Sequence, residues 1–272
     1  MNYVNSLSIY GFMNKNCQKI DNSLSFWKTK SHSQLVSCIK PLDIIPENVQ
    51  KISYMYLDKD PGIKGTYMTE QITSIIDNTF LKDNLTRKNH KEIFETYRKY
   101  QSRITVHEDL NYIQRHYDDI IEMIEEWRYA DYGGMKYMWQ ERAGVDKAFF
   151  KKYLEDIFLQ DQISVYIFTH NELDNKIIGY SVMPNIYSIN DHHVPEVSYM
   201  LRKCLLKNDK VNLRNITEYI DWITFCNTMK NLNIDILAVN WGCSDKGVKW
   251  YKEHKWPLLY KENKYFVNIK LS

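Results

Sequence analysis

The sequence predicts an α/β fold built on a mixed sheet, and three observations support this prediction. From residue 147 onward, helical and strand patterns alternate along the chain. The segment 234–239 is apolar except for Asp235, which is typical of a strand whose two sheet faces are both covered. A short polar loop at 240–246, a helix, Pro257 and a closing strand follow this segment. Ligands bind in open α/β sheets where such strands end, so we expect a site at this loop.

The first half of the chain predicts short strands mixed with helices. Alternating apolar residues predict strands at 35–39, 51–58 and 103–107. A helix is predicted near 72–80, where the isoleucines and Phe80 would share one face, and a basic helix is predicted near 86–100. Asp109 is expected to cap a further helix whose apolar stripe ends at Trp127.

The second half of the chain gives a clearer order of elements. Asp131-Tyr-Gly-Gly interrupts the helical pattern, so we divide the chain into predicted domains at 1–128 and 129–272. Asn215 and Glu218 have the spacing of a capping box at the start of a helix. The predicted elements are, in order, a helix at 147–158, hairpin strands at 163–170 and 176–183, a strand at 196–202, a helix from 216 and a strand at 234–239.

Composition narrows the classes of function. The net charge of +2 gives no global signature of nucleic-acid binding. The segment 82–103, which includes Arg87 and Lys88, is locally basic and is either a solvated helix face or a phosphate contact surface. The five cysteines have no CxxC spacing, so neither a metal site nor a disulfide framework is expected.

The same composition bears on where the protein works. No apolar run approaches the roughly 18 residues of a membrane span, and the first residues lack the basic start and apolar centre of a signal peptide. We therefore expect a cytoplasmic protein without a membrane partner. The sequence leaves the oligomeric state open.

The end of the chain carries a family resemblance. Gly247-Val-Lys-Trp-Tyr-Lys, followed by Trp256-Pro257, is similar to the closing motif of GNAT-superfamily acyltransferases in their FemAB-like and DUF2156-type branch. The resemblance covers residues 80–272 loosely and 147–272 better. It implies a GNAT-like fold in two halves, of which the N-terminal one is divergent.

One departure from the GNAT pattern bears on the acyl donor. GNAT acetyltransferases hold the pyrophosphate of CoA on a glycine-rich loop after the fourth strand, but Leu205 and Lys207 stand at the glycine positions here. Acetyl-CoA is therefore a less favoured donor than an activated amino acid, commonly aminoacyl-tRNA, which the FemAB-like resemblance implies. Some phage relatives are thought to act on modified DNA bases, which would place the protein in the host cytoplasm.

Acyl transfer needs a base for the acceptor and an acid for the leaving group. By the resemblance, Tyr251 is the candidate acid, although a helix aromatic packed on the sheet accounts for it equally well. His193 and Glu196 are candidate bases at the start of the 196–202 strand, and a polar surface loop is the simpler account of them.

Further polar residues are candidates for holding the two substrates. Candidate donor-binding residues are Arg214, Asn240, Ser244 and Lys246; each also has a plain account as a loop, capping or solvated residue. Candidate substrate-binding residues are Arg87, Lys88 and, in a presumed lid or connecting loop at 136–147, Glu141, Arg142 and Asp146.

Together these features predict an acyltransferase that moves an acyl group, preferably aminoacyl, to an amine or hydroxyl. The favoured acceptor is a nucleic acid, such as a modified base in phage DNA, and DNA or tRNA is the predicted partner. Two alternatives stay open. One is an acetyl-CoA-dependent N-acetyltransferase, and the other is a GNAT-fold binding protein that has lost catalysis.

Overall fold

The computed structural model describes residues 17–19, 26–29, 34–37, 51–57, 59–60, 62, 64, 66–129, 136–199, 201–243 and 246–270. The chain forms two compact units that interleave in sequence. Unit 1 comprises residues 1–75, 188–198 and 238–272, and unit 2 comprises residues 76–187 and 199–237. These two units are defined by contacts within the fold and do not test the predicted domain boundary after residue 128, which stays a prediction. None of the described helices is both long and apolar enough to cross a membrane.

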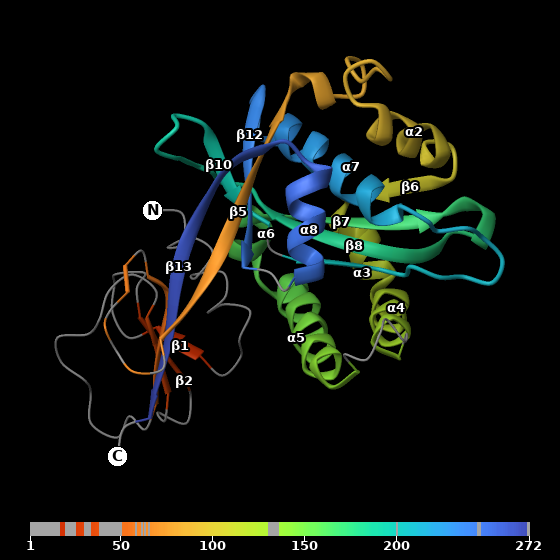
Figure 1. Ribbon diagram of the computed structural model, residues 1–272. Helices are drawn as coiled ribbons and strands as arrows, with labels where there is room; N and C mark the ends of the chain where they lie inside the picture. The colour runs from red at the N-terminus through yellow and green to blue at the C-terminus, as the bar shows by residue number, and fades with distance from the viewer. Residues whose placement is uncertain are drawn as a thin grey trace. The chain divides into compact units, whose positions relative to one another are not determined.

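The elements follow one another along the chain as Figure 1 labels them. The strands are β1 (Cys17–Lys19), β2 (Phe26–Thr29), β3 (Gln34–Ser37), β4 (Lys51–Leu57), β5 (Tyr67–Asp77), β6 (Ile104–His107), β7 (Ile163–His170), β8 (Lys176–Pro184), β9 (Ser188–Ile189), β10 (Pro195–Ser198), β11 (Leu201–Cys204), β12 (Ile236–Cys243) and β13 (Leu258–Lys270). The α-helices are α2 (Lys91–Tyr100), α3 (Leu110–Arg115), α4 (Tyr117–Tyr129), α5 (Lys136–Glu155), α6 (Ile157–Gln162), α7 (Ile216–Leu232) and α8 (Lys246–Lys255).

Unit 1 is organised around a mixed sheet. Over the described residues its strand order is β1-β2-β3-β4-β13-β5-β12-β10-β9. The long strand β13 pairs antiparallel with both β4 and β5, while β10 pairs parallel with β12. In that parallel pair Glu196 lies opposite Ala238, and Ser198 lies opposite Asn240. Consequently, strands far apart in sequence meet at the centre of the sheet.

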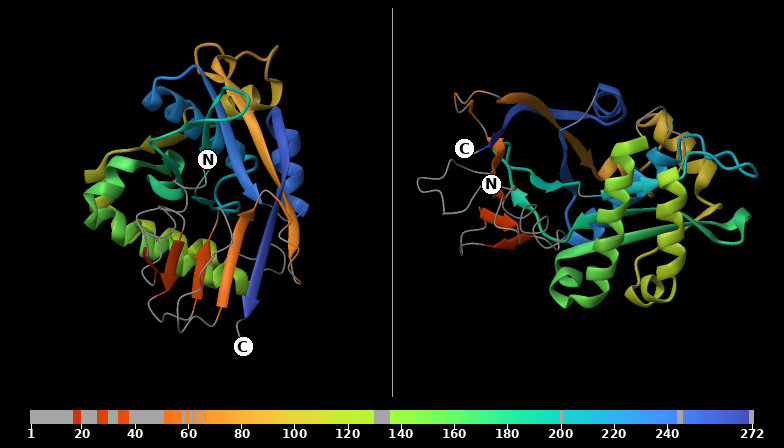
Figure 2. Two further views of the ribbon diagram at one scale, coloured as in Figure 1. Left: turned by 90° about the vertical axis from the view of Figure 1, so that its left-hand side faces the viewer. Right: turned by 90° about the horizontal axis from the view of Figure 1, so that it is seen from below.

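Unit 2 is a sheet covered by helices on both faces. Its described strands run in the order β11-β8-β7-β6, and every neighbouring pair is antiparallel. Helix α7 contacts β7 and β8 and packs against α2, whereas α4 contacts β8 and β11 and packs against α5 (Figure 1). The view from below shows α4 and α5 side by side across these strands (Figure 2).

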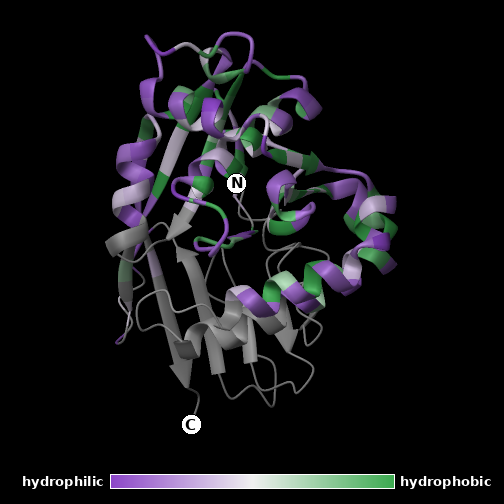
Figure 3. Ribbon diagram, turned by 90° about the vertical axis from the view of Figure 1, so that its right-hand side faces the viewer, coloured by the Kyte–Doolittle hydropathy of each residue, from purple (hydrophilic) through white to green (hydrophobic). Residues whose placement is uncertain are grey.

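Helix α7 is the core helix of unit 2. Its side chains are buried around most of its circumference, and the buried set includes the polar residues Glu218, Asp221, Thr224 and Thr228. Trp222 is 1% exposed, and its Nε1 donates to the carbonyl oxygen of Phe80 at 2.7 Å. Other helices carry hydrophilic and hydrophobic residues side by side, as Figure 3 shows. A helix with this pattern can pack its hydrophobic face on a sheet and expose its hydrophilic face to solvent.

Most of the predicted elements are confirmed. The hairpin β7–β8 turns through Asp174 and Asn175, which both have positive φ. Asp109 caps α3 by accepting from the amide of Asn111, as predicted, but the helix expected to run to Trp127 divides at His116 into α3 and α4. Leu237, Ala238 and Val239 are all 0% exposed, which confirms that both faces of this strand are covered.

The helix predicted at 72–80 is wrong, because these residues belong mainly to strand β5. The four residues from Gln71 to Ser74 are all 0% exposed, so both faces of this strand are buried. A strand with two covered faces shows no alternation, and its isoleucines then mimic a helical stripe. The β-branched residues of 72–76 favour the strand instead.

Three further local predictions are wrong. The strand predicted at 196–202 is two strands, β10 and β11, which join different sheets. The segment 136–147, predicted as a loop, lies in α5. Asn215 precedes α7 with φ 65° and makes no side-chain capping bond, so the capping box is absent. An asparagine tolerates this left-handed conformation, and backbone bonds close the first turn in its place.

The Trp222 hydrogen bond gives a test of the fold. Replacing Trp222 by Phe keeps an aromatic ring but removes the indole donor to the buried Phe80 carbonyl, which also accepts from Cys226 Sγ at 3.5 Å. We expect the free energy of unfolding in urea to fall by about 1–3 kcal/mol. The matched control is Trp250→Phe, at a side chain that is 56% exposed, where a change within about 0.5 kcal/mol is expected. Equal effects of the two substitutions would contradict this account of the core.

Candidate active site

A buried carboxylate lies in the sheet of unit 1, on the strand beside the edge strand β9. Glu196 on β10 is 4% exposed and accepts from three side chains. Its Oε2 accepts from Asn190 Nδ2 at 3.0 Å and from Tyr260 Oη at 2.5 Å. Its Oε1 accepts from Asn240 Nδ2 at 3.3 Å. We call Glu196, Asn190, Asn240 and Tyr260 the Glu196 cluster.

The strand register explains why these side chains meet. Side chains alternate between the two faces of a sheet, so Glu196 and Asn240, which lie two positions apart across the parallel pair, share a face. Asn190 lies in the turn before β10, where its Oδ1 accepts from the amides of His192 and Val194, each at 3.0 Å. These bonds fix the asparagine so that its amide group reaches Glu196.

Burial sets the chemistry of the cluster. A carboxylate inside a protein is costly unless hydrogen bonds replace its water, and the three donors supply that replacement. Burial and the bond to Glu196 raise the pKa of Tyr260 well above its usual range, so its hydroxyl stays protonated and donates. A carboxylate can accept about four hydrogen bonds. Oε1 has one donor among the described residues and can accept a further hydrogen bond.

Among the described interactions, only one of the two neighbouring histidines contacts the cluster through its ring. The ring of His192 stacks on Tyr260 with the centroids 4.9 Å apart. His193, predicted as a base, is exposed and occupies the turn with φ 60°. Its amide donates to the carbonyl of Asn190 at 2.9 Å. The structure thus places Glu196 in the cluster and His193 on the turn that supports it.

Asn240 lies on a strand and not in the predicted loop. The ladder of β10 and β12 continues through Asn240, and β12 ends at Cys243. The strand can extend through Asn240 and Trp241 because their side chains form hydrogen bonds to residues of neighbouring strands. Asn240 reaches Glu196 and, at 3.5 Å, Gln71 Oε1, while Trp241 Nε1 donates to Ser74 Oγ at 2.8 Å.

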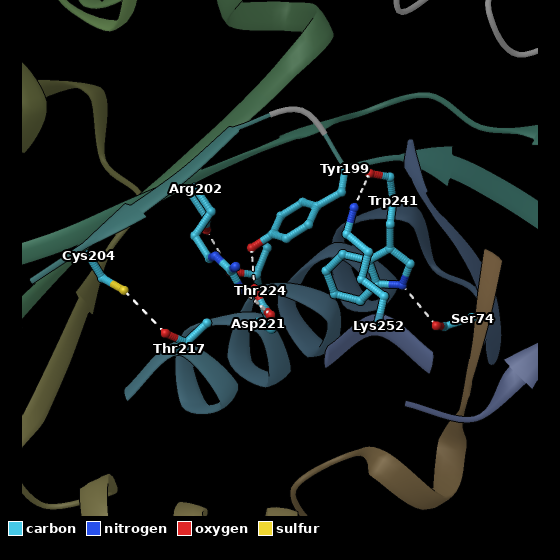
Figure 4. Close-up of polar contacts among 10 residues, drawn as sticks. Ser74, Tyr199, Arg202, Cys204, Thr217, Asp221, Thr224, Trp241 and Lys252 are labelled. Carbon is cyan, nitrogen blue, oxygen red and sulfur yellow. Dashed lines mark hydrogen bonds and ion pairs between the residues drawn. The ribbon is translucent and has the colours of Figure 1, made fainter. Parts of the chain in front are cut away.

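Helix α8 packs its side chains against β12. Tyr251, the predicted acid, meets the ring of Trp241 edge-on at a centroid distance of 6.4 Å. Figure 4 shows Lys252 reaching the Trp241 carbonyl, to which its Nζ donates at 2.8 Å, and the indole pointing to Ser74. Lys246 is described only as the first residue of α8, and Ser244 lies outside the described residues.

A group of cationic side chains lies at the start of α7 in unit 2. Lys99 Nζ donates to the carbonyl of Arg214 at 2.9 Å, and Arg214 itself is exposed just before the helix. Burial, followed by the positive charges of Arg103 and Arg214, lowers the pKa of Lys99. Arg103 is paired with Glu172 at 3.2 Å, which leaves Lys99 and Arg214 as the cations that could meet an anion beside the N-terminal end of the helix.

Backbone amides around this helix start are already engaged. The amide of Leu205 donates to Ile178 at 2.8 Å, and that of Arg214 donates to Asn212 Oδ1 at 2.9 Å. The amide of Ile216 donates to the carbonyl of Leu213 at 3.0 Å. These amides do not form an open cradle of the kind that glycine-rich loops offer to a pyrophosphate.

The predicted substrate residues do not gather at one place. Asp146 is 1% exposed in unit 2, where it accepts from Tyr180 Oη at 2.6 Å and lies 3.8 Å from Lys203 Nζ. Arg87 pairs with Glu95 at 3.2 Å on an exposed surface, and Lys88 is exposed. Of Glu141 and Arg142, only the helical backbone in α5 is described.

Sequence reasoning missed several polar residues that the fold depends on. Tyr199 Oη donates to Asp221 Oδ1 at 2.7 Å, and Arg202 pairs with the other oxygen of this buried carboxylate (Figure 4). An aspartate in the middle of an apolar helix is a signal that could have indicated a buried cationic partner. Tyr260 and Asn190 gave no comparable signal, because tyrosines and turn asparagines are common in this chain.

The Tyr260 hydroxyl provides a test of the Glu196 cluster. Tyr260→Phe removes a charge-assisted hydrogen bond from a buried carboxylate, and we expect the free energy of unfolding to fall by about 1.5–3 kcal/mol. Tyr187→Phe is the matched control, because that side chain is 42% exposed and should tolerate the change within about 0.5 kcal/mol. Urea titration followed by tryptophan fluorescence measures both. Unchanged stability of Tyr260→Phe would argue against the bond.

Comparisons with known proteins place the fold. No family profile and no curated protein matches the sequence. A conserved protein of unknown function from Bacteroides thetaiotaomicron is similar in structure, with a TM-score of 0.53 and 14% identity over 98% of this chain and 90% of the other. The C-terminal DUF2156 domain of a proposed lysylphosphatidylglycerol synthetase from Agrobacterium fabrum has a TM-score of 0.49 and 10% identity, with coverages of 100% and 88%.

A tandem GNAT protein from the clavulanic acid biosynthesis pathway has a TM-score of 0.45 and 7% identity, over 82% of this chain and 65% of the other. Within the chain itself, the hairpin β7–β8, the divided strand β10/β11, helix α7, strand β12, helix α8 and strand β13 follow the predicted GNAT order. The chain therefore has the mixed α/β fold that its sequence predicts, and the Bacteroides thetaiotaomicron protein shares this fold over nearly the whole chain.

Proposed function

We propose that this chain is an acyltransferase that moves an aminoacyl group to an amine or hydroxyl, with a nucleic-acid base as the favoured acceptor. The observation that carries the proposal is the Glu196 cluster. A buried carboxylate with one oxygen held by a single described donor is suited to receive a proton from an acceptor. The GNAT fold supports acyl transfer as the class of reaction.

In the proposed reaction the acceptor nitrogen or oxygen attacks the acyl carbonyl directly. The acceptor proton passes to Glu196, and the bond between the carbonyl carbon and the leaving group breaks as the tetrahedral intermediate collapses. Tyr251 is the proposed donor of the proton that the leaving group takes up. Asn190, Asn240 and Tyr260 position the carboxylate, so their substitution should act through Glu196.

Two observations support an aminoacyl donor over acetyl-CoA. The amides of Leu205, Arg214 and Ile216 are engaged within the protein, which leaves them unavailable to a pyrophosphate. Lys99, whose Nζ donates to the Arg214 carbonyl, and the exposed Arg214 nevertheless place positive charge at the start of α7. Such charges suit the phosphates of a tRNA end without requiring a glycine loop.

The proposed acceptor is a nucleic-acid base. The exposed basic residues Arg87 and Lys88 support a contact with a nucleic-acid backbone. Binding through phosphates alone would weaken steeply with salt and would not depend on sequence. This behaviour would separate a backbone contact from recognition of the acceptor base.

A transfer assay tests the proposal. The purified protein is incubated with isotope-labelled aminoacyl-tRNA or acetyl-CoA and with DNA, tRNA or a small amine, and mass spectrometry locates the label. We expect transfer from aminoacyl-tRNA, and a loss of about 10²–10⁴-fold in rate for Glu196→Gln. Glu155→Gln is the matched control, because Glu155 is an exposed carboxylate of α5 in unit 2.

The outcomes separate the alternatives. Transfer from acetyl-CoA alone would replace the proposed donor while keeping the class of reaction. Full activity of Glu196→Gln would remove the proposed base. Absence of transfer from either donor, by protein whose circular dichroism shows it folded, would contradict the proposal and favour a binding protein.

A further inference from the structure

A second candidate site lies in unit 2 and shares no residue with the Glu196 cluster. An open groove of about 700 Å³ is lined by α3, α4, the end of β6 and the turn of the β7–β8 hairpin. This volume lies within the range of small-molecule sites. The residues on which the argument depends are His107, Tyr112, His116, Asp119, Glu122 and Asp174.

Three stacked rings form one wall of the groove. Tyr112 lies between His107, at a centroid distance of 3.7 Å and an interplanar angle of 3°, and His116, at 4.2 Å and 30°. His107 Nε2 lies 3.0 Å from Thr169 Oγ1, and His116 Nδ1 lies 2.8 Å from Asp119 Oδ2. Each histidine is thus anchored by a hydrogen bond, and the wall is built before any ligand arrives.

The groove also has an apolar part and an acidic part. Met123 and Ile177 line it with side chains that are 1% and 4% exposed. Glu122 from α4 and Asp174 from the hairpin turn make no ion pair within the described part of the chain. Lys176, a cation in the lining, is engaged with Glu126 at 2.5 Å.

We propose that this groove binds an organic cation, in the form of an ammonium or guanidinium group on an aliphatic stem. The stem would lie along Met123 and Ile177, and the charge would lie between Glu122 and Asp174. Phosphate-bearing ligands are disfavoured, because these carboxylates and Asp119 would repel them. The described residues contain no cluster suited to a metal ion, so a bare divalent cation is a poorer fit.

Calorimetric titration of the full chain at low salt tests this inference. The probes are spermidine and a capped tri-arginine peptide, with a capped tri-glutamate peptide as the anionic comparison. We expect at least one cationic probe to bind and the anionic peptide not to bind. The double variant Glu122→Gln, Asp174→Asn should weaken binding by about tenfold or more, and raising the salt to 0.5 M should weaken it as well.

The variants keep the fold comparable. Asn tolerates the positive φ of Asp174, and Glu122 is exposed, so neither substitution disturbs the core. Asp118→Asn is the matched control, since Asp118 is an exposed carboxylate on the same helix that does not line the groove. Tyr112→Ala, which removes the middle ring of the wall, should also weaken binding, with folding checked by circular dichroism.

The outcomes distinguish a free polyamine from a basic protein partner, and some of them would overturn the inference. Binding of spermidine alone points to a free polyamine, and binding of the peptide alone points to basic side chains of a protein partner. The inference is overturned if neither cation binds or if tri-glutamate binds equally well. An equal loss in Asp118→Asn would overturn it too. None of these results depends on whether the chain transfers acyl groups.

Discussion

A buried negative charge is the constraint on which the candidate active site depends. The Glu196 carboxylate has almost no contact with solvent, so the sheet must supply the hydrogen bonds that water would have made. Those bonds come from β12, β13 and the turn before β10. The register of the parallel pair and the path of β13 are therefore coupled to the position of one carboxylate.

The same rule operates in unit 2. Asp221 on α7 is fully buried and is satisfied by Tyr199 and Arg202, which flank the point where the chain passes from β10 to β11. Asp146 on α5 is satisfied by Tyr180 and lies beside Lys203. Both carboxylates connect a helix to the neighbouring strand residues. Each is therefore costly to leave without its partners, which favours one packing of the helices on the sheet.

Much of the fold could be predicted because the apolar residues of many segments recur with the spacing of either a helix or a strand. The hairpin β7–β8 and the end of the chain from β12 to β13 have strong apolar patterns and turn residues at their boundaries. Strand β5 could not be recognised, because both of its faces are buried and its pattern fits either period. The extension of β12 through Asn240 could not be predicted either. An asparagine is typical of a loop, and its hydrogen bond to Glu196 is known only from the structure.

The site was only partly predictable. Glu196 could be chosen because it is a carboxylate at a strand start, but its donors come from distant parts of the chain. Nothing in the local sequence distinguishes Tyr260 among the 21 tyrosines of the chain. A pairing of this kind becomes visible only when the strand order β13-β5-β12-β10 is known.

The Glu196 carboxylate and the Tyr260 hydroxyl stabilise each other inside the sheet. A double-mutant cycle with Glu196→Gln, Tyr260→Phe and the combined variant measures this coupling from urea unfolding. The account predicts a coupling free energy of about 1.5–3 kcal/mol, as for a buried hydrogen bond to a charged group. Additive effects of the two substitutions, with coupling near zero, would contradict it.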